Sequence, residues 1–230
     1  LVPTKKFYNF YKSYFWNKKH SVSYITAKIA ISSDYLTINK KNKWITNFSS
    51  RNLVHLLRNK YDCILSTSKS INNDNSLLNC RINGLNNNKP DLFIVDMKLQ
   101  LKKKLLLNSL LKKRKTYLIT KKIKIKKSLV YKKLGYKIIL IDQLNDKNDF
   151  NFLCKRIYNM GYSRLLIESG LTFLNYLLKY KLINEVYIFK SSYKLGKNGK
   201  NNDTLYHLKK INPKLLTINL NNDKVLKKIF

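Results

Sequence analysis

The sequence predicts an α/β fold with a central, mostly parallel sheet flanked by helices. Short unbroken apolar runs, such as residues 165–167, are typical of strands that are covered on both faces. Stretches with helical spacing alternate with these runs, and Phe173, Leu174, Leu177 and Leu178 fall on one helical face. This alternation of strand and helix implies parallel strands joined by right-handed crossovers.

In the first half of the chain, strands are predicted where β-forming residues cluster, at residues 23–32, 61–67 and 91–96. Lys28 interrupts the apolar character of the first strand. Apolar spacing predicts a helix over residues 49–60, with Thr46 or Asn47 as its N-cap. The polar, Asn-rich segment 70–90 has no period and predicts a loop, which either clamps a ligand or only connects two elements.

In the second half, further strands are predicted at residues 115–120, 136–141 and 185–190, with a final strand or two at 215–220 and 224–230. A helix is predicted over residues 148–160, capped by Asn148 or Asp149. Residues 101–115 are rich in Leu and Lys and fit either a helix or a loop. Residues 121–127 read KKIKIKK and predict a basic, solvated connection.

The chain of 230 residues is long enough for one α/β domain with a buried core, and no internal repeat or Pro/Gly-rich linker divides it. Residues 1–20 are rich in aromatic residues, lack a clean period and predict a connecting arm. The three cysteines form no CxxC pair, so we expect neither a disulfide framework nor a structural zinc site, and a reducing compartment. No apolar run is long enough to cross a membrane and the first residues lack a signal-peptide pattern, so we expect a cytoplasmic protein.

The net charge of +35 arises from 47 Lys and Arg against 12 Asp and Glu. Most of the basic residues are lysines, they are spread along the chain, and they accompany many Asn, Ile, Leu and Tyr residues, as in proteins from strongly AT-biased genomes. A nucleic-acid surface would concentrate charge on one face and would favour Arg. We therefore interpret the charge as compositional, with a basic nucleic-acid-binding protein as the alternative function.

Glu168 stands directly after the apolar run at residues 165–167 and before a turn in which Gly170 is expected to ease the change of direction. In open α/β sheets ligands bind beside such strand ends, and the first N–H groups of the following helix favour anions. Glu168 is therefore a candidate ligand-facing carboxylate. The alternative is that it caps the helix or pairs with one of the many lysines. The sequence contains no GxGxxG, P-loop or zinc-deaminase motif.

Several segments match, in order, the motifs of one enzyme family. They read AKIAISSDY in the first strand, WIT at residues 44–46, VHLLRNKYDCI in the next helix and strand, SINNDNSLLNCR in the loop and ESGLT after the later strand. The chain resembles the reductase domain of the bifunctional riboflavin-biosynthesis deaminase–reductase, a pyrimidine reductase with a dihydrofolate-reductase-like fold. The resemblance runs from Ser23 to Gly199 and implies a reductase domain over residues 21–230, with residues 1–20 as an interdomain arm.

The resemblance implies reduction of 5-amino-6-(5-phosphoribosylamino)uracil to its ribitylamino product, with hydride delivered from NADPH to C1 of the ribose. It places substrate contacts at Asn42, Arg58, Leu78, Arg81 and Glu168. It assigns catalytic roles to Lys28, Asp74 and Glu168, because opening of the sugar needs a proton donor or acceptor. It places cofactor contacts at Ala30, Trp44, Ser70, Asp74, Gly170, Leu171, Thr172 and Phe173, and it implies no metal ion.

Some of these residues have simpler explanations. Trp44 fits a large core residue, Lys28 fits a lysine whose head reaches out from a strand edge, and Asp74 fits an Asx turn. His55 is interpreted as structural, because the helix pattern places it beside solvent. A reductase of the same fold that acts on a pterin is a second alternative function.

The sequence also departs from the family pattern. Tyr35 replaces a glycine where φ above zero is expected, and Ser76, Asn79 and Leu171 replace Pro, Thr and Pro. The zinc deaminase half of the family lies outside these residues, so the deaminase is expected either upstream in the same chain or as a separate protein. A homodimer is expected by analogy with the family.

Overall fold

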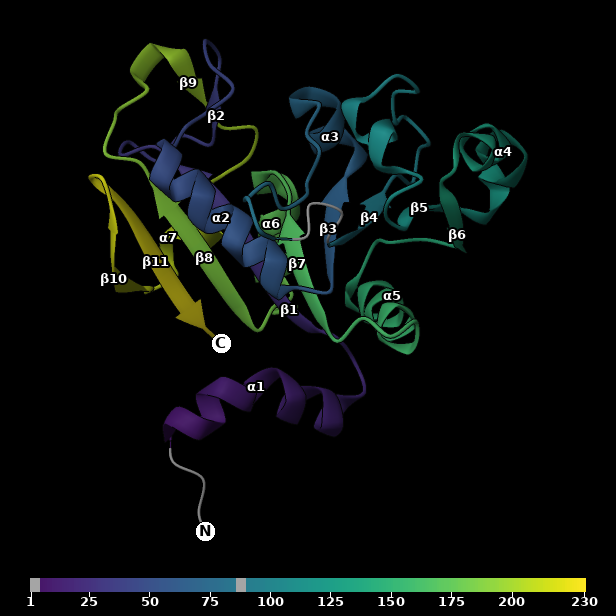
Figure 1. Ribbon diagram of the computed structural model, residues 1–230, viewed down its shortest axis with the longest axis horizontal. Coiled ribbons are helices and arrows are strands. Elements are labelled where there is room, and N and C mark those ends of the chain that lie inside the picture. The colour runs from purple at the N-terminus through teal and green to yellow at the C-terminus, as the bar shows by residue number, and fades with distance from the viewer. Residues whose placement is uncertain (1–4, 86–89) are drawn as a thin grey trace.

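The computed structural model describes residues 5–85 and 90–230. Within these ranges nine strands form one sheet in the order β10-β11-β8-β1-β7-β3-β4-β5-β6, with β6 and β10 at its two edges (Figure 1). The strands are β1 (Tyr24–Ile31), β3 (Cys63–Thr67), β4 (Asp91–Val95), β5 (Thr116–Lys121), β6 (Lys137–Ile141), β7 (Arg164–Glu168), β8 (Glu185–Lys190), β10 (Lys214–Leu220) and β11 (Asp223–Ile229). Every neighbouring pair from β8 to β6 is parallel, whereas β11 runs antiparallel to β8 and to β10.

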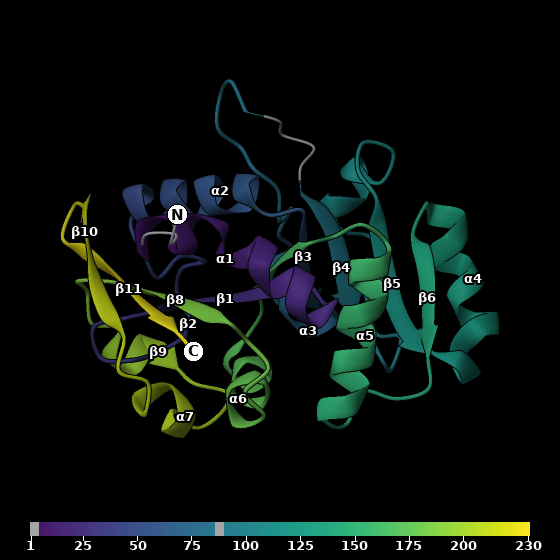
Figure 2. The same cartoon turned by 90° about the horizontal axis from the view of Figure 1, so that it is seen from below.

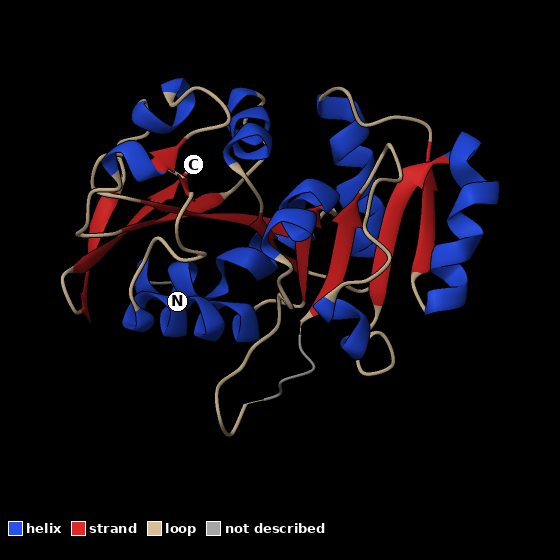
Figure 3. Ribbon diagram, turned by 90° about the horizontal axis from the view of Figure 1, so that it is seen from above, coloured by secondary structure: helices blue, strands red, loops and turns tan. Residues whose placement is uncertain are grey.

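Helices cover both faces of this sheet, as Figures 2 and 3 show from opposite sides. They are α1 (Lys5–His20), α2 (Phe48–Lys60), α3 (Ser68–Asp74), α4 (Ile125–Leu134), α5 (Lys147–Asn159), α6 (Leu171–Lys179) and α7 (Tyr206–Lys209). Core residues of α5, α6 and α7 share one buried cluster with the sheet, and those of α2, α3 and α4 belong to two clusters on the other face. The predicted fold class, a mostly parallel sheet flanked by helices, is confirmed.

The strand predicted from the apolar run at 165–167 is the central strand β7. Leu165 and Ile167 pack in the cluster that contains α5 and α6, and Leu166 packs in the opposite cluster; none is more than 1% exposed. The two-sided burial predicted from the unbroken apolar run is therefore confirmed. Because β7 lies between β1 and β3, its carboxyl end lies beside the carboxyl ends of two parallel neighbours.

Residues 1–20 were predicted to be a connecting arm because they lack a clean period; in the described part of this segment, residues 5–20 form the helix α1. Figure 1 shows this helix lying across the end of the sheet near the start of β1. The Asn17 amide donates to the carbonyls of Val22 (2.7 Å) and Ser163 (3.1 Å), and Trp16 makes an edge contact with Tyr24. These tertiary contacts stabilise a helix that the local sequence pattern does not predict. In proteins, most of the stability of a helix comes from such packing rather than from its intrinsic propensity.

Two further predicted loops contain helices. Part of the 70–90 loop belongs to α3, whose N-cap Thr67 accepts from Ser70 N (3.2 Å) and whose C-cap Asn75 has a left-handed backbone. The basic connection at 121–127 holds a 3-10 turn, Lys122–Lys124, and the start of α4. The α4 pattern is weak because only Ser128 and Tyr131 of that helix are buried.

Helix ends were predicted with mixed success. Asn47 is the N-cap of α2 and accepts from Ser50 N (2.9 Å), which settles the choice against Thr46. The cap of α5 is Asp146 rather than Asn148 or Asp149, because Asp146 and Asp149 form a reciprocal capping box. The ambiguous Leu and Lys stretch at 101–115 contains only a short 3-10 helix, Leu106–Leu110.

Two shorter pieces complete the described part of the chain. The two-stranded sheet of β2 (Ile38–Asn39) and β9 (Gly199–Lys200) joins the segment after β1 to the segment after β8. A 3-10 turn, Gly196–Asn198, precedes β9. In residues 5–85 and 90–230, no helix combines the length and the apolar character needed to span a bilayer.

Candidate active site

The centre of the site is Glu168, the last residue of β7. The parallel pairing of β1 with β7 places Lys28 directly opposite it, and the neighbouring helix α2 supplies Arg58. Arg58 donates from Nε to Oε1 of Glu168 at 2.6 Å and from Nη2 to Oε2 at 2.9 Å. Such a two-point guanidinium–carboxylate pair fixes the direction of both side chains. Glu168 is 8% exposed and Arg58 is 9% exposed, so the pair is largely shielded from water.

Lys28 completes this cluster from the neighbouring strand. Its Nζ lies 4.0 Å from Oε2 of Glu168 and 5.8 Å from the centre of the Phe189 ring. Since β1 lies between β8 and β7, the alternative of a lysine reaching out from a sheet edge is wrong. Burial lowers the pKa of the Lys28 ammonium, and the Glu168 carboxylate only partly offsets this effect.

The charge of Glu168 is set by its partners. Burial acts to raise the pKa of its carboxyl, but Arg58 and, more weakly, Lys28 bring the pKa below its ordinary value. Glu168 is therefore an ionised carboxylate at neutral pH. The alternative that it caps the next helix is wrong, because the N-cap of α6 is Gly170 and that end has no side-chain cap.

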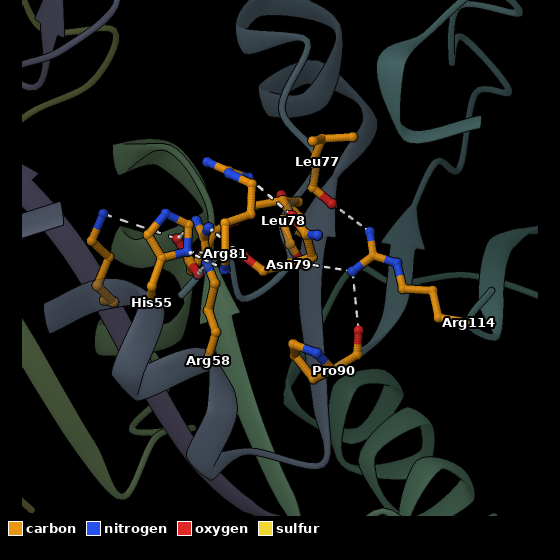
Figure 4. A network of polar contacts seen from close by, with 11 residues as sticks. His55, Arg58, Leu77, Leu78, Asn79, Arg81, Pro90 and Arg114 are labelled. Atoms are coloured by element: carbon orange, nitrogen blue, oxygen red, sulfur yellow. Dashed lines mark hydrogen bonds and ion pairs between the residues drawn. The ribbon is translucent and has the colours of Figure 1, made fainter. Parts of the chain in front are cut away.

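A second group of polar residues adjoins Arg58 on the side of the loop that follows α3. Arg58 Nη1 donates to the carbonyl of Asn79 (3.1 Å), and Nδ1 of His55 lies 3.0 Å from the same oxygen. Arg81 Nη1 donates to Oδ1 of Asn79 at 2.9 Å. Figure 4 shows these side chains gathered around the Leu77–Asn79 backbone. Arg81 is exposed, so its guanidinium can meet an anion from solvent.

His55 was interpreted as structural from the sequence, yet it lies in this group. Burial, together with the charges of Arg58 and Arg81, lowers the pKa of its imidazole to about 4, so the ring is neutral at physiological pH. The signal for its location was present in the helix pattern. His55 and Arg58 are three residues apart, a spacing that places two side chains on the same helical face.

Ser70 and residues 170–173, which were expected to bind the cofactor, lie together where α3 and α6 begin. Ser70 Oγ accepts from Gly170 N (3.1 Å) and from Thr67 Oγ1 (3.0 Å), so it joins the α3 turn to the start of α6. Gly170 has φ −72°, and an added Cβ would meet its nearest neighbours at 3.8 Å, in ordinary contact. Gly170 was expected to ease the change of direction, but this backbone conformation is open to any residue and does not depend on glycine.

The side chains in the first turn of α6 differ in their exposure to solvent. Thr172 is exposed, whereas Leu171 is fully buried in the core and Phe173 packs against Phe150 with ring centres 6.2 Å apart. Leu171 can therefore meet a ligand only through its backbone N–H. An uncapped helix N-terminus with free N–H groups fits the phosphates of a dinucleotide.

The other candidate residues lie around this centre at different depths. Ala30 is half-buried against the core cluster under α2, and Asn42 is exposed with its N–H donating to Asn39 Oδ1 (3.1 Å). Trp44 is 50% exposed with the Arg51 guanidinium 4.9 Å from its ring centre, so the alternative of a core tryptophan is wrong.

Asp74 lies at the end of α3, and Leu78 lies in the loop that follows. Asp74 is the last residue of α3; desolvation raises the pKa of its carboxyl against the opposing charges of Lys43 and Lys28. The Leu78 side chain is 5% exposed in the core cluster, with a left-handed backbone at φ 50°. Leu78 can thus contribute to a ligand site only through its backbone. Among the described residues, no three His, Cys, Asp or Glu side chains are grouped so as to hold a metal ion.

The departure at Tyr35 has the conformation expected from the family pattern. Tyr35 has φ 63°, in the left-handed region that favours glycine. The Lys190 ammonium lies 4.0 Å from the centre of its ring, and Asn201 Nδ2 donates to its carbonyl at 3.0 Å. These contacts hold a tyrosine at a position that strains its backbone.

Comparison with known proteins places these residues in a family. The family model described as the RibD C-terminal domain matches residues 23–223. The riboflavin biosynthesis protein RibD of Buchnera aphidicola subsp. Baizongia pistaciae is 29% identical over 199 residues, which cover 82% of this chain and 53% of that protein. RibD of Actinobacillus pleuropneumoniae is 25% identical over 168 residues, covering 72% of this chain and 44% of that protein. The chain thus spans about half the length of these curated relatives.

Solved structures share the fold. RibD of Acinetobacter baumannii superposes with a TM-score of 0.78 at 19% identity, covering 96% of this chain and 62% of that chain. The Saccharomyces riboflavin biosynthesis reductase Rib7 superposes with a TM-score of 0.69 at 19% identity, covering 97% of this chain and 98% of that chain. The resemblance stated from the sequence motifs is confirmed: the chain belongs to the RibD C-terminal domain family.

Proposed function

We propose that this chain reduces 5-amino-6-(5-phosphoribosylamino)uracil to 5-amino-6-(5-phosphoribitylamino)uracil with NADPH as the reductant. The observation that carries the proposal is the cluster of Lys28, Arg58 and Glu168 at the carboxyl end of the central strands. This cluster stands in a chain that belongs to the RibD C-terminal domain family. NADPH when bound supplies the hydride, and the residues of the chain supply the charges and the proton.

Opening of the ribosylamine breaks the bond between C1 and the ring oxygen and leaves a C1=N⁺ double bond. The ring oxygen takes up a proton and becomes a hydroxyl group, and C1 then accepts the hydride. Lys28 is suited to provide that proton, because burial lowers the pKa of its ammonium and eases proton release. The Glu168 carboxylate, fixed by Arg58, is suited to stabilise the positive charge that develops next to C1.

We propose different roles for the two arginines. All three nitrogens of Arg58 have partners, two with Glu168 and one with the Asn79 carbonyl, so Arg58 orients the carboxylate. Arg81 is exposed, and we assign to it the contact with the substrate 5-phosphate, for which a guanidinium offers charge-assisted donors. Asn42 and the Leu78 backbone are proposed as further substrate contacts.

The remaining residues are proposed to bind NADPH. Gly170 N donates to Ser70 Oγ and holds the start of α6 in place. The N–H groups of Leu171, Thr172 and Phe173 are proposed to bind the dinucleotide phosphates. Ala30, Trp44 and Asp74 are proposed to meet other parts of the cofactor. The exposure of Trp44 supports its proposed role, because an exposed indole offers an apolar face to a planar ring.

The larger assembly is also a proposal. We infer a reductase domain over residues 21–230 that works with a zinc deaminase domain, either upstream in the same chain or as a separate protein. Supporting this inference, the chain covers only 53% and 44% of its two curated RibD relatives. A homodimer and a cytoplasmic location are proposed by analogy with the family.

The test is consumption of NADPH by the purified chain, with substrate generated by a separate deaminase. We expect substrate-dependent loss of NADPH absorbance and formation of the ribitylamino product. Turnover of dihydrofolate without the phosphoribosyl substrate would instead support the pterin alternative. A folded chain that binds DNA at physiological salt and neither binds nor oxidises NADPH would support the nucleic-acid alternative.

A further inference from the structure

Arg114 is a buried cation that the proposed mechanism does not use. It lies in the turn before β5, is 6% exposed, and faces the Leu77–Asn79 backbone from the side opposite to Arg58 and His55 (Figure 4). Its position in the run KKRK gave no sequence signal, because the neighbouring lysines are exposed and look the same in a pattern. Burial lowers the pKa of Arg114 to about 10, so the guanidinium remains charged at neutral pH.

The guanidinium of Arg114 binds backbone on both sides of one loop. Nη1 donates to the carbonyls of Leu78 (2.7 Å) and Pro90 (3.0 Å), and Nη2 donates to the carbonyl of Leu77. A planar fork of donors can reach three carbonyls in this way, whereas an ammonium group cannot reproduce the geometry. Arg114 therefore ties the segment after α3 to the start of β4.

The segment that Arg114 holds is strained. Leu78 has φ 50°, which is unfavourable for a branched side chain and persists only where surrounding contacts enforce it. Arg114 bonds the carbonyls of Leu77 and Leu78, directly before and after the strained φ, ψ pair. The side chain of Leu78 is buried in the core cluster, which fixes the same residue from the other side.

The next residues carry the substrate-side contacts. The Asn79 carbonyl accepts from Arg58 Nη1 and contacts His55 Nδ1, and the Asn79 side chain accepts from Arg81. A shift of the Leu77–Leu78 backbone would therefore displace Asn79 and, through it, Arg81. Arg114 hydrogen-bonds to Leu77 and Leu78, and it acts on Arg81 only through Asn79.

We propose that Arg114 is a positioning residue for substrate binding, which sets the backbone of Leu78 and Asn79 so that Arg81 faces the site. This inference rests on the proposed reductase function for its kinetic consequence. It assigns to Arg114 no contact with the substrate or with the cofactor. The cofactor side of the site, built on Ser70 and Gly170, is held by separate hydrogen bonds and is independent of Arg114.

The test compares Arg114→Lys and Arg114→Met with Lys113→Met, which removes an exposed charge from the same turn. In the Arg114 variants we expect the KM for the phosphoribosyl substrate to rise about tenfold or more, because misplacing a binding group weakens its contact. We expect the affinity for NADPH to stay within about twofold of the starting chain. Arg114→Met should raise the KM for the phosphoribosyl substrate more than Arg114→Lys does. Lys113→Met should change neither quantity.

A second readout needs no turnover. NMR titration of the imidazoles reports His55 directly, and the signals of His20 and His207 report whether the whole chain stays folded. Four groups face His55: the charges of Arg58, Arg81 and Glu168 and the Asn79 carbonyl. If the loop moves away in Arg114→Lys, reduced burial and loss of the Arg81 charge raise the His55 pKa toward its ordinary value of 6.5.

The outcomes separate the two proposals. If the starting chain lacks turnover, the reductase proposal fails, and the His55 titration still decides whether Arg114 sets the loop. An unchanged His55 pKa in a folded Arg114→Met chain overturns the inference, as does a shifted pKa with an unchanged KM in an active enzyme. Loss of NADPH affinity together with changes at His20 and His207 in both Arg114 variants also overturns it, because the role would then be one of general folding.

Discussion

The substitution Glu168→Gln tests the centre of the site through stability as well as rate. Glutamine keeps the shape of the side chain and one acceptor oxygen but places an amide NH₂ group against a donor of Arg58. In the structure, Arg58 gives Glu168 hydrogen bonds of 2.6 and 2.9 Å, and both residues are less than 10% exposed. The variant therefore leaves a buried guanidinium without its counter-charge.

The size of the effect follows from these contacts. Removing one partner of a buried pair typically costs about 3–5 kcal/mol, and the retained hydrogen bond offsets about 1 kcal/mol or more of it. We expect Glu168→Gln to lower the free energy of unfolding by about 3 kcal/mol at neutral pH. Asp142→Asn is the matched control, because its ion pair with Lys122 at 2.9 Å is well exposed and should contribute little.

The pH dependence of this loss has a definite sign. Because the pKa of Glu168 is lowered in the folded chain, its stabilising contribution is complete above its ordinary value of 4.5 and is lost as the pH falls through the lower, folded value. The stability difference between the starting chain and Glu168→Gln should therefore narrow on acidification below 4.5.

Urea unfolding followed by tryptophan fluorescence measures these free energies across the pH range. Turnover in the same variant should fall by about a hundredfold, the usual scale for a positioned charged group. Equal stability of the two chains at neutral pH would refute the role of the Arg58 pair. A difference that widens on acidification would refute the assigned ionisation of Glu168.

Further predictions concern the other groups of the site and its departures from the family pattern. Lys28→Met should lower turnover by about a hundredfold while leaving NADPH affinity unchanged; a near-normal rate would remove Lys28 as the proton donor. Arg81→Ala should raise the KM for the phosphoribosyl substrate by about tenfold or more with a smaller change in turnover number; an unchanged KM would place the phosphate elsewhere. Tyr35→Val should lower the free energy of unfolding by about 1–2 kcal/mol, because a β-branched residue tolerates positive φ poorly. Tyr35→Gly should have a free energy of unfolding within about 1 kcal/mol of the starting chain. Thermal or urea unfolding compares the two, and a Val variant more stable than the Gly variant would contradict the backbone strain at this position. Gly199→Ala should also lower the free energy of unfolding, by about 1–3 kcal/mol in the same assay, because the new Cβ would lie 2.4 Å from Leu36 Cδ1 and 2.7 Å from Leu195 Cβ. Equal stability would show that Leu36 and Leu195 move aside readily.

The local sequence was sufficient to predict structure where that structure depends on residues close together in the chain. The buried run at 165–167 predicted a strand covered on both faces, and Asn47 predicted the start of α2. Family motifs, which combine many weak local matches, led to the correct family from residues such as Arg58 and Glu168.

Local sequence failed where distant segments decide the environment. The periodicity of residues 5–20 does not announce a helix, but Asn17 and Trp16 bind to segments that the sheet brings near. Residue type alone left a core position open as the alternative for Trp44, and only the fold shows that Trp44 is exposed beside Arg51. His55 was interpreted as structural, because the helix pattern places it beside solvent. Its contacts with Asn79 and Arg81 could not be predicted, because they come from a loop whose path no pattern in the sequence gives.

The sequence by itself determined the α/β class, most of the strand positions and the family, because hydrophobic period and motif order are properties of neighbouring residues. Only the tertiary structure decided which charges meet. Arg58 and Glu168 are 110 residues apart, and the Arg114 guanidinium binds carbonyls that lie 24 to 37 residues earlier in the chain. The Glu168 contacts form at the carboxyl ends of the parallel strands, and the Arg114 contacts form where the segments before β4 and β5 meet the loop after α3. The strength of both sets depends on the burial that this packing creates.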